Sequence, residues 1–303
     1  MALNLHLLRI FYTVVDTQSF SKAAETLFIS QPAVSKAVRE LERQLDLALI
    51  ERGARPVRGV HLTEAGRALH EHARSIFALE RVALEDVRAR VGLQRGSLTI
   101  GASTTVGGFW LPRYLSAFMR RFPEVPPDLR IGNTHTISQA LLDCHLDLAV
   151  VEGSVEDPRI ASTHWHDDAL LLVAAAGSEL VARRRVAPAD LSANVWLLRE
   201  PGSGTREVAD RFLREHGVTP RHTVEIGSNA AIARVVAEGA GIALLPAMMV
   251  ADLIALKRVM RVPYRKDESV SRPLFVLQLK DRPLSPAATA FRALLDQSPS
   301  ARL

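Results

Sequence analysis

The stretch SFSKAAETLFISQPAVS, residues 19–35, decides the fold of the first part of the chain. We expect a short helix over Ser21–Leu27 and a longer one over Gln31–Leu45, where apolar residues recur every three to four positions. Between them, Ser30 is a good N-cap, and Pro32 falls in the first helical turn, where a missing N–H costs nothing. Two short helices joined by a tight turn predict a helix-turn-helix.

The longer of these helices is expected to enter the major groove of double-stranded DNA. Its N-terminal end favours phosphate through the helix dipole, and its exposed face is polar. The residues predicted to contact bases and phosphates are Ser30, Gln31, Pro32, Ser35, Lys36 and Arg39. An ordinary helical hairpin with a solvated polar face is the alternative at this point.

Residues 49–62 favour a wing beside that helix. Leu49–Ile50 and His61–Leu62 are typical of short strands, and the segment between them is rich in turn residues and has no acid after Glu51. Its guanidinium groups suit phosphate or a narrow minor groove. The predicted wing contacts are Arg52, Arg55 and Arg58. Such hairpins are more often solvated loops, but the neighbouring helix-turn-helix favours the DNA-binding interpretation.

A long helix is predicted from Thr63 to about Arg90. Apolar residues recur in it at spacings typical of a short coiled coil, which predicts a dimerisation seam. The residues expected in that seam are Leu62, Leu69, Ile76 and Leu79. The same stripe could instead pack on the rest of its own chain.

The whole front segment resembles the winged helix-turn-helix of LysR-type transcriptional regulators. The match lies at residues 19–24, 27, 29–35, 41–42, 45 and 62–66. Phe28 departs from it, in a turn where glycine is common, and we interpret it as a detail of packing. The resemblance implies a bacterial regulator that binds DNA as a dimer or tetramer. It also implies a C-terminal domain with two lobes, like periplasmic solute-binding proteins, that binds a small effector.

Composition limits the classes of protein that fit. The 303 residues are 48% hydrophobic and 23% charged, which is typical of a soluble globular protein with two or three domains. The net charge of +5 is a weak sign of a polyanionic partner. The single cysteine, Cys144, cannot form an internal disulfide, and no apolar run reaches the roughly 18 residues of a membrane span. We expect a cytoplasmic protein with no signal sequence and no membrane contact.

From Ser97 onward, strands and helices alternate, which predicts α/β layers with mostly parallel sheets. One of these strands is expected over Leu170–Ala175, and the chain is expected to leave one sheet near Ser162–His166. The predicted domains are a winged helix at 1–62, a linker and dimerisation helix at 63–91 and an effector domain at 92–303. By the resemblance, lobe I covers about 95–164 plus 270–303, and lobe II covers 165–269.

Four strand ends in this region carry short hydrogen-bonding side chains. Ligands of open α/β sheets bind beyond the carboxyl ends of strands, where helix N-termini present free N–H groups. We therefore expect a polar cleft for a small anion, and the resemblance leaves an organic acid and an inorganic oxyanion both open. The expected contacts are Ser103, Thr104, Thr105, Asn133, Thr134, Ser203, Thr205 and Ser228. The resemblance implies Ser103, Thr104, Thr134, Thr205 and Ser228 as the best candidates. Taken singly, Ser203 and Ser228 could equally be plain helix caps, and Arg206 could pair with a neighbouring acid.

The sequence offers no nucleophile–base pair and no metal-ligand cluster, so no catalytic residue, metal or cofactor is expected. The predicted function is sequence-specific regulation of transcription at a promoter site with dyad symmetry. The predicted protein is a homodimer or homotetramer controlled by its effector. An enzyme or a transport-type binding protein on the same scaffold is the competing class.

Overall fold

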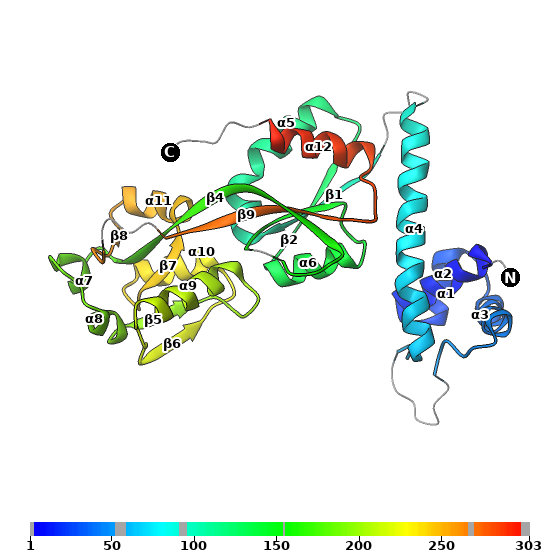
Figure 1. The fold of residues 1–303 in the computed structure, drawn as a ribbon, viewed down its shortest axis with the longest axis horizontal. Helices are drawn as coiled ribbons and strands as arrows, with labels where there is room; N and C mark the ends of the chain where they lie inside the picture. Colours follow the sequence, from blue (N-terminus) through cyan, green and yellow to red (C-terminus); the bar gives the residue numbers. More distant parts are fainter. Residues whose placement is uncertain (1–2, 52–58, 91–95, 154, 266–269, 298–303) are drawn as a thin grey trace. The chain divides into compact units, whose positions relative to one another are not determined.

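The computed structural model describes residues 3–51, 59–90, 96–153, 155–265 and 270–297 (Figure 1). The chain divides into two compact units, Met1–Leu84 and Glu85–Leu303, and each is described by itself. None of the helices in the described ranges is both long enough and apolar enough to span a membrane.

The first unit is helical. Its elements are α1 (Leu5–Thr17), α2 (Phe20–Leu27), α3 (Gln31–Leu45) and the part of α4 (Glu64–Arg90) that ends at Leu84. Fully buried side chains from α1 and α3, among them Leu8, Phe11 and Leu41, form its core. Ser30 caps α3 as predicted, accepting a hydrogen bond from the N–H of Ala33 at 3.4 Å. The cap of α2 is Ser19 rather than Ser21, so that helix begins one residue earlier than expected.

Each of the first three helices ends on a left-handed residue that is not glycine: Gln18, Phe28 and Asp46, with φ of 53°, 55° and 54°. Phe28 forms the turn between α2 and α3, and its side chain is 95% exposed. The interpretation of Phe28 as a packing detail is therefore wrong, because the ring packs against nothing in the described chain.

The base of the wing is formed as predicted. Ile50 and Leu62 form an antiparallel bridge, and the N–H of Glu51 donates to the carbonyl of His61 at 2.9 Å. The buried carboxylate of Glu42, on α3, accepts a hydrogen bond from the N–H of Leu49 at 2.9 Å and so fixes the first wing strand. The predicted wing contacts Arg52, Arg55 and Arg58 lie outside the described residues.

The four residues of the predicted dimerisation seam differ in how far they are exposed. Leu62, Leu69 and Ile76 are half-buried against the core of their own unit, as the alternative interpretation had it. Leu79 is 49% exposed, and further along α4 Val87 is 61% exposed. The apolar surface that α4 leaves open thus lies nearer its C-terminal end than the sequence pattern indicated.

The second unit contains a seven-stranded sheet in the order β2-β1-β3-β9-β4-β7, with β8 paired to β4, and a separate pair β5-β6. The strands are β1 (Leu98–Ser103), β2 (Pro127–Gly132), β3 (Leu148–Glu152), β4 (Ile160–Ala175), β5 (Val195–Leu198), β6 (His222–Glu225), β7 (Ala243–Pro246), β8 (Val259–Arg261) and β9 (Val270–Leu279). The helical segments are η1 (Val106–Trp110, a π-helix), α5 (Pro112–Arg121), α6 (Thr134–Leu142), α7 (Glu179–Ala182), α8 (Pro188–Ser192), α9 (Gly204–Glu215), α10 (Asn229–Ala237), α11 (Ala247–Ala255) and α12 (Pro286–Asp296).

The prediction of mostly parallel sheets is wrong for the large sheet. β1 pairs in parallel with β2 and β3, but every pair that involves β4 or β9 is antiparallel. β4 begins at Ile160, not Leu170, and it pairs with β9 from Ile160–Leu279 to Leu170–Val270. The chain therefore does not leave the sheet near residues 162–166. It shows only a register shift there, between His164 and His166.

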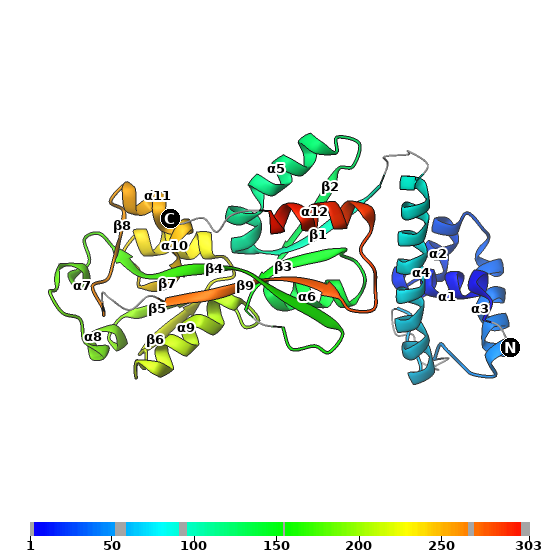
Figure 2. The same cartoon turned by 45° about the horizontal axis from the view of Figure 1, so that its top comes forward.

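β4 and β9 run side by side from one half of this unit to the other (Figure 2). We call the half built on β1–β3 with α5, α6 and α12 lobe I, and the half built on β5–β8 with α7–α11 lobe II. Each lobe has its own buried clusters, around Phe118 and Leu141 in lobe I and around Trp196 and Leu245 in lobe II. The two long strands thus make a continuous link between the lobes.

Candidate functional site: an exposed helix face and an interlobe polar network

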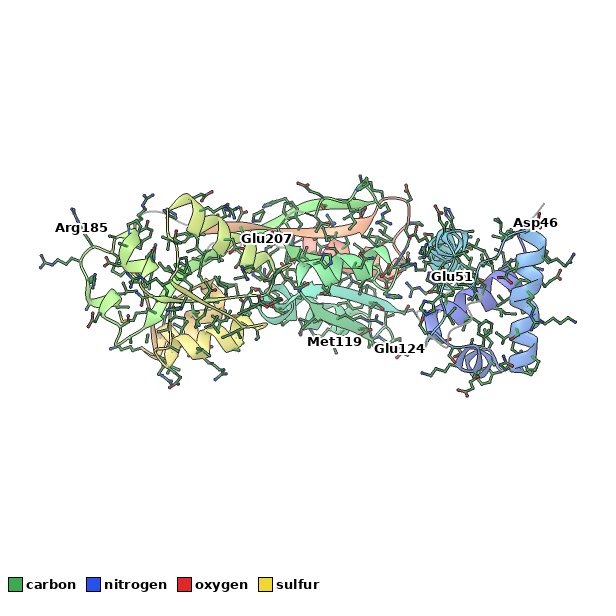
Figure 3. All side chains as sticks on the ribbon, turned by 90° about the horizontal axis from the view of Figure 1, so that it is seen from below. Asp46, Glu51, Met119, Glu124, Arg185 and Glu207 are labelled. Atoms are coloured by element: carbon green, nitrogen blue, oxygen red, sulfur yellow. The ribbon has the colours of Figure 1, made fainter. Side chains whose placement is uncertain are left out.

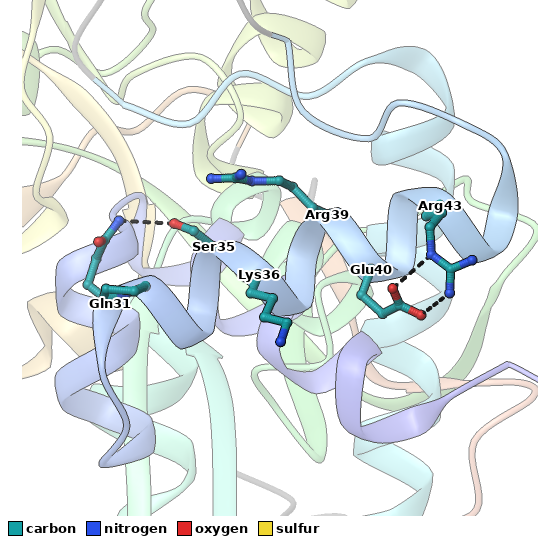
Figure 4. A pocket seen from close by; sticks show the side chains of 7 residues that line it. Gln31, Ser35, Lys36, Arg39, Glu40 and Arg43 are labelled. Atoms are coloured by element: carbon teal, nitrogen blue, oxygen red, sulfur yellow. Dashed lines mark hydrogen bonds and ion pairs between the residues drawn. The ribbon is translucent and has the colours of Figure 1, made fainter.

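The first candidate site is the outer face of α3, which borders a groove in the first unit (Figure 4). Its lining residues are Gln31, Pro32, Ser35, Lys36, Arg39, Glu40 and Arg43. The amide of Gln31 donates to the hydroxyl of Ser35 at 3.0 Å, which orders the first turn. Lys36 and Arg39 are exposed, and the figure shows their side chains extending away from the helix. Five of the predicted contacts therefore line one surface, and the sixth, Ser30, caps the helix at its start.

An ion pair at the far end of α3 limits which cations are available. Arg43 donates to both carboxylate oxygens of Glu40, at 2.9 and 2.5 Å. These bonds lower the pKa of Glu40 from its usual 4.5 to about 2, so the carboxylate stays charged near neutrality. Arg39 makes no ion pair within the described part of the chain, so its guanidinium is available for a partner outside the protein.

The second candidate site is a buried polar network in the second unit, centred on Arg272 of β9. Arg272 is 1% exposed, and it lies directly opposite Asp168 of β4 in the strand register. Its Nε and Nη2 donate to Asp168 Oδ2 at 3.0 and 2.8 Å, and Nη2 lies 3.2 Å from Glu152 Oε1 at the end of β3. One buried guanidinium thus forms ion pairs with two buried carboxylates.

The same guanidinium joins hydroxyls from both lobes. Arg272 Nη1 donates to Thr205 Oγ1, in the first turn of α9, at 2.8 Å, and Nη2 donates to Thr105 Oγ1, just after β1, at 3.2 Å. Asn229, the first residue of α10, donates from its Nδ2 to the same two hydroxyls, at 3.3 Å for Thr105 and 3.0 Å for Thr205. The buried Oδ1 of Asn229 has no hydrogen-bond partner in the described structure. Such an oxygen costs free energy until a donor reaches it.

Close backbone packing holds this arrangement. A side chain at Gly204, the first residue of α9, would place its Cβ 2.7 Å from the Cβ of Glu152. Only glycine therefore lets the N-terminus of α9, in lobe II, approach the end of β3, in lobe I, so closely.

A second branch of polar contacts joins the lobes beside the first. Arg199, 3% exposed at the end of β5, donates to Thr104 Oγ1 at 3.0 Å and pairs with Glu200 at 2.8 Å. Glu200 also accepts from Asn133 Nδ2 at 3.2 Å, and its bonds to Arg199 lower the pKa of its carboxyl. The side chain of Arg206 is taken up by Asp210 and by the carbonyl of Arg199, as the alternative for this residue had it.

Two carboxyls at the polar network have raised pKa values. Burial raises the pKa of Asp168, and the nearby Arg272 offsets that rise only in part. Burial, followed by the charge of Glu152, also raises the pKa of Glu207, which is labelled on α9 in Figure 3. The cations Arg272 and Arg199 both already have acidic partners. An anion entering here would meet hydroxyls and helix N-termini rather than an uncompensated positive charge.

The eight predicted effector contacts fall into three groups. Thr105 and Thr205 meet at Arg272 and Asn229, and Thr134 reaches that network through Glu152. Thr104 and Asn133 belong to the second branch, where they bond to Arg199 and Glu200. The remaining three serve their local structure. Ser103 accepts from the N–H of Val106, Ser228 caps α10, and Ser203 is buried at the start of α9 without a side-chain cap bond.

Sequence reasoning missed four residues that matter most to the network: Glu152, Asp168, Asn229 and Arg272. Asn229 directly follows Ser228 and could have been found, because its stretch was one of the four polar strand ends. Arg272 had no local signal, since a cation within a strand usually indicates an exposed position. Only its pairing across β4 reveals its role.

Comparison with known proteins matches both units to one family. Residues 5–67 match the bacterial regulatory helix-turn-helix protein, lysR family, and residues 92–299 match the LysR substrate binding domain. The chain is 31% identical over 292 residues to a RuBisCO operon transcriptional regulator of Allochromatium vinosum, covering 96% of this chain and 95% of that one. It is 36% identical over 308 residues to the transcriptional regulator CfxR of Cupriavidus necator, with coverage of 97% and 91%.

Two solved structures extend the comparison. Full-length CbnR in complex with its target DNA superposes with a TM-score of 0.65 at 24% identity, covering 98% of this chain and 100% of that one. The CcmR regulatory domain of Synechocystis PCC6803, in complex with 2-PG, superposes with a TM-score of 0.61 at 25% identity, covering 66% and 96%.

Proposed function

The chain belongs to the LysR family of transcriptional regulators, which are not enzymes, and we propose that it recognises a specific promoter sequence through α3. The observation that carries this proposal is the exposed face of α3, with Gln31, Ser35, Lys36 and Arg39 along one groove. Amide and hydroxyl groups suit base edges, and Arg39 suits guanine or phosphate. Ser30 and Pro32 would present the N-terminus of α3 to the phosphate backbone. Arg52, Arg55 and Arg58 would extend the contact into the neighbouring groove.

We propose a division of labour along the chain. Residues 1–62 bind DNA, residues 63–91 hold two copies together, and residues 92–303 sense an effector. Lobe I is proposed at about 95–164 plus 270–303, and lobe II at 165–269. This division is supported by the separate cores of the lobes and by the long strands that link them.

A homodimer or homotetramer would present two such faces to a site with dyad symmetry. The exposed side chains of Leu79, Ala83 and Val87 recur every four residues on α4 and give a seam for a second helix. Leu62, Leu69 and Ile76 would support that seam from within their own unit.

The proposed effector is a small anion that binds between the lobes. The hydroxyls of Thr105 and Thr205 accept from Arg272 and Asn229, so each can donate its own proton to the anion. The N-termini of α9 and α10 favour negative charge. The relative CcmR was solved with 2-PG, which supports a small ligand at this domain type. A ligand that prefers one lobe arrangement would shift the populations of two oligomer geometries. The distance between the two DNA-binding faces would then differ between the ligand-bound and the ligand-free protein.

Gel-shift titration on DNA from upstream of the protein's own gene tests the DNA-binding proposal. Lys36→Ala and Arg39→Ala should each weaken binding while the oligomeric state, measured by light scattering, stays the same. Arg43→Ala is the matched control, because Arg43 is already paired with Glu40. Equal affinity of all three variants and the wild type would remove α3 from the interface.

A thermal-shift screen of organic acids and inorganic oxyanions tests the effector proposal. Binding to the native state raises the melting temperature with ligand concentration. Thr205→Val should abolish the shift given by an anion that stabilises the wild type. A shift that persists in Thr205→Val would place the ligand elsewhere.

A further inference from the structure

Phe28 breaks two local rules of the fold. It closes α2 in the left-handed region, with φ of 55°, where glycine would carry no steric cost. Its ring is 95% exposed, so burial of apolar surface does not offset that cost. Positions that break local rules without a gain in the folded chain are expected at functional sites.

The place of Phe28 in the fold indicates which function it serves. It lies two residues before Ser30, the N-cap of α3, so their Cα atoms are at most about 7.6 Å apart. Ile29 beside it is 39% exposed, and Gln31 and Pro32 are exposed as well. The exposed apolar pair Phe28–Ile29 therefore adjoins the N-terminal end of the α3 face in the chain.

We propose that the ring of Phe28 packs against an apolar edge of the DNA, either a thymine methyl group or a deoxyribose. Phe28 then adds an uncharged DNA contact to the polar and cationic ones of α3, and it determines sequence specificity if that contact is a thymine methyl group. Apolar side chains read thymine through its methyl group in the major groove. The inference rests on the proposed function, because it requires α3 to lie at the DNA.

The experiment compares two variants of the full-length protein that keep the turn but lose the ring. Phe28→Gly and Phe28→Asn both accept the left-handed conformation. Asp46→Gly is the matched control, because Asp46 closes α3 with nearly the same φ of 54° at the opposite end of that helix. The probe is the DNA upstream of the protein's own gene, as normal DNA and with uracil in place of thymine.

We expect both Phe28 variants to lose about tenfold in affinity while their melting temperature stays the same or rises. The slope of log affinity against log salt should stay unchanged in them, because the lost contact is uncharged, whereas Lys36→Ala should reduce it by about 1. Asp46→Gly should lose no affinity. If the contact is a thymine methyl, uracil DNA should weaken the wild type and have no further effect on Phe28→Gly. If it is a deoxyribose, the wild type should bind both DNAs equally.

Three results would overturn the inference. One is a DNA affinity in both Phe28 variants that equals that of the wild type. If these variants also lost transcription in a purified system, the ring would contact a protein partner instead of DNA. Another is a melting temperature that falls together with the affinity, which would make the ring structural. The third is a reduced salt slope in the Phe28 variants. If Lys36→Ala and Arg39→Ala also keep full affinity, the proposed function fails as well. If they lose affinity and the Phe28 variants do not, only the inference on Phe28 fails.

Discussion

Replacing Arg272 with methionine removes the cation that faces the buried carboxylates of Glu152 and Asp168. Glu152 and Asp168 are 3% and 2% exposed and would lose their ion pair, while Thr105 and Thr205 would lose a donor. Breaking a buried pair by removing one partner costs roughly 3–5 kcal/mol. For a unit of this size, each kcal/mol lowers the melting temperature by about 2–4 °C, so a fall of about 10 °C is expected at pH 7.5.

The deficit of Arg272→Met should shrink as the pH falls. Without the cation, the pKa of Asp168 rises further above its usual 3.8, so the folded state binds more protons than the unfolded state. The free energy of unfolding then falls as the pH rises through the folded pKa, and it recovers toward low pH. Each unit of difference between the folded and unfolded pKa corresponds to about 1.4 kcal/mol.

Thermal denaturation followed by circular dichroism at pH 5, 6.5 and 8 measures this effect. Arg292→Met is the matched control, because Arg292 pairs with Asp296 on the surface of α12, and such pairs contribute less than about 1 kcal/mol. The reasoning is refuted if Arg272→Met loses no more than Arg292→Met, or if its deficit is the same at all three pH values.

Three further predictions follow from the same contacts. Gly66→Ala should prevent stable folding of the first unit, because its Cβ would lie 2.0 Å from the carbonyl oxygen of Leu49; a cooperative melt like that of the wild type would contradict this close approach. Asn229→Leu should abolish anion binding in the thermal-shift screen while the melting temperature without ligand falls by only a few degrees, and retained anion binding would show that its amide is not needed. The affinity for the anion should rise as the pH falls from 8 to 6, because an anion near Asp168 and Glu207 raises the pKa of both carboxyls further and its binding takes up protons. Calorimetry in two buffers of different ionisation enthalpy should detect this proton uptake. No uptake would be seen if the anion bound away from these carboxyls.

The helices of the first unit could be predicted closely because their signals are local. Ser30 and Pro32 mark the start of α3 within three residues of sequence, and the observed helix has the predicted bounds. The exposure of Phe28 could not be predicted, for the opposite reason. A left-handed, exposed phenylalanine leaves no trace in apolar periodicity, which counts Phe as a core residue wherever it stands.

The central strand pair was hard to predict because its partners lie about a hundred residues apart. The first half of β4 reads IASTHWHDD, a polar sequence with few of the residues that favour strands. It becomes a strand because β9 pairs with it, and Asp168 is buried only because Arg272 lies opposite. Neither acid nor cation could be assigned to a core from its own neighbourhood. The sequence therefore predicts the hydroxyls of the interlobe polar network but not its charges.

The position of that charge pair gives a physical route from the proposed effector site to the geometry of the lobes. Asp168 lies two residues beyond His166, at the edge of the register shift in the strand pair that links the lobes. Arg272 donates hydrogen bonds to Asp168 and also to the hydroxyls of Thr105 and Thr205. An anion that accepted hydrogen bonds from these hydroxyls would add a negative charge beside Arg272 and compete with Asp168 and Glu152 for its guanidinium. Because β4 and β9 form one hydrogen-bonded pair that links the lobes, a movement of one lobe relative to the other would bend or twist this pair. The ligand and the bend would thus act on the same few residues.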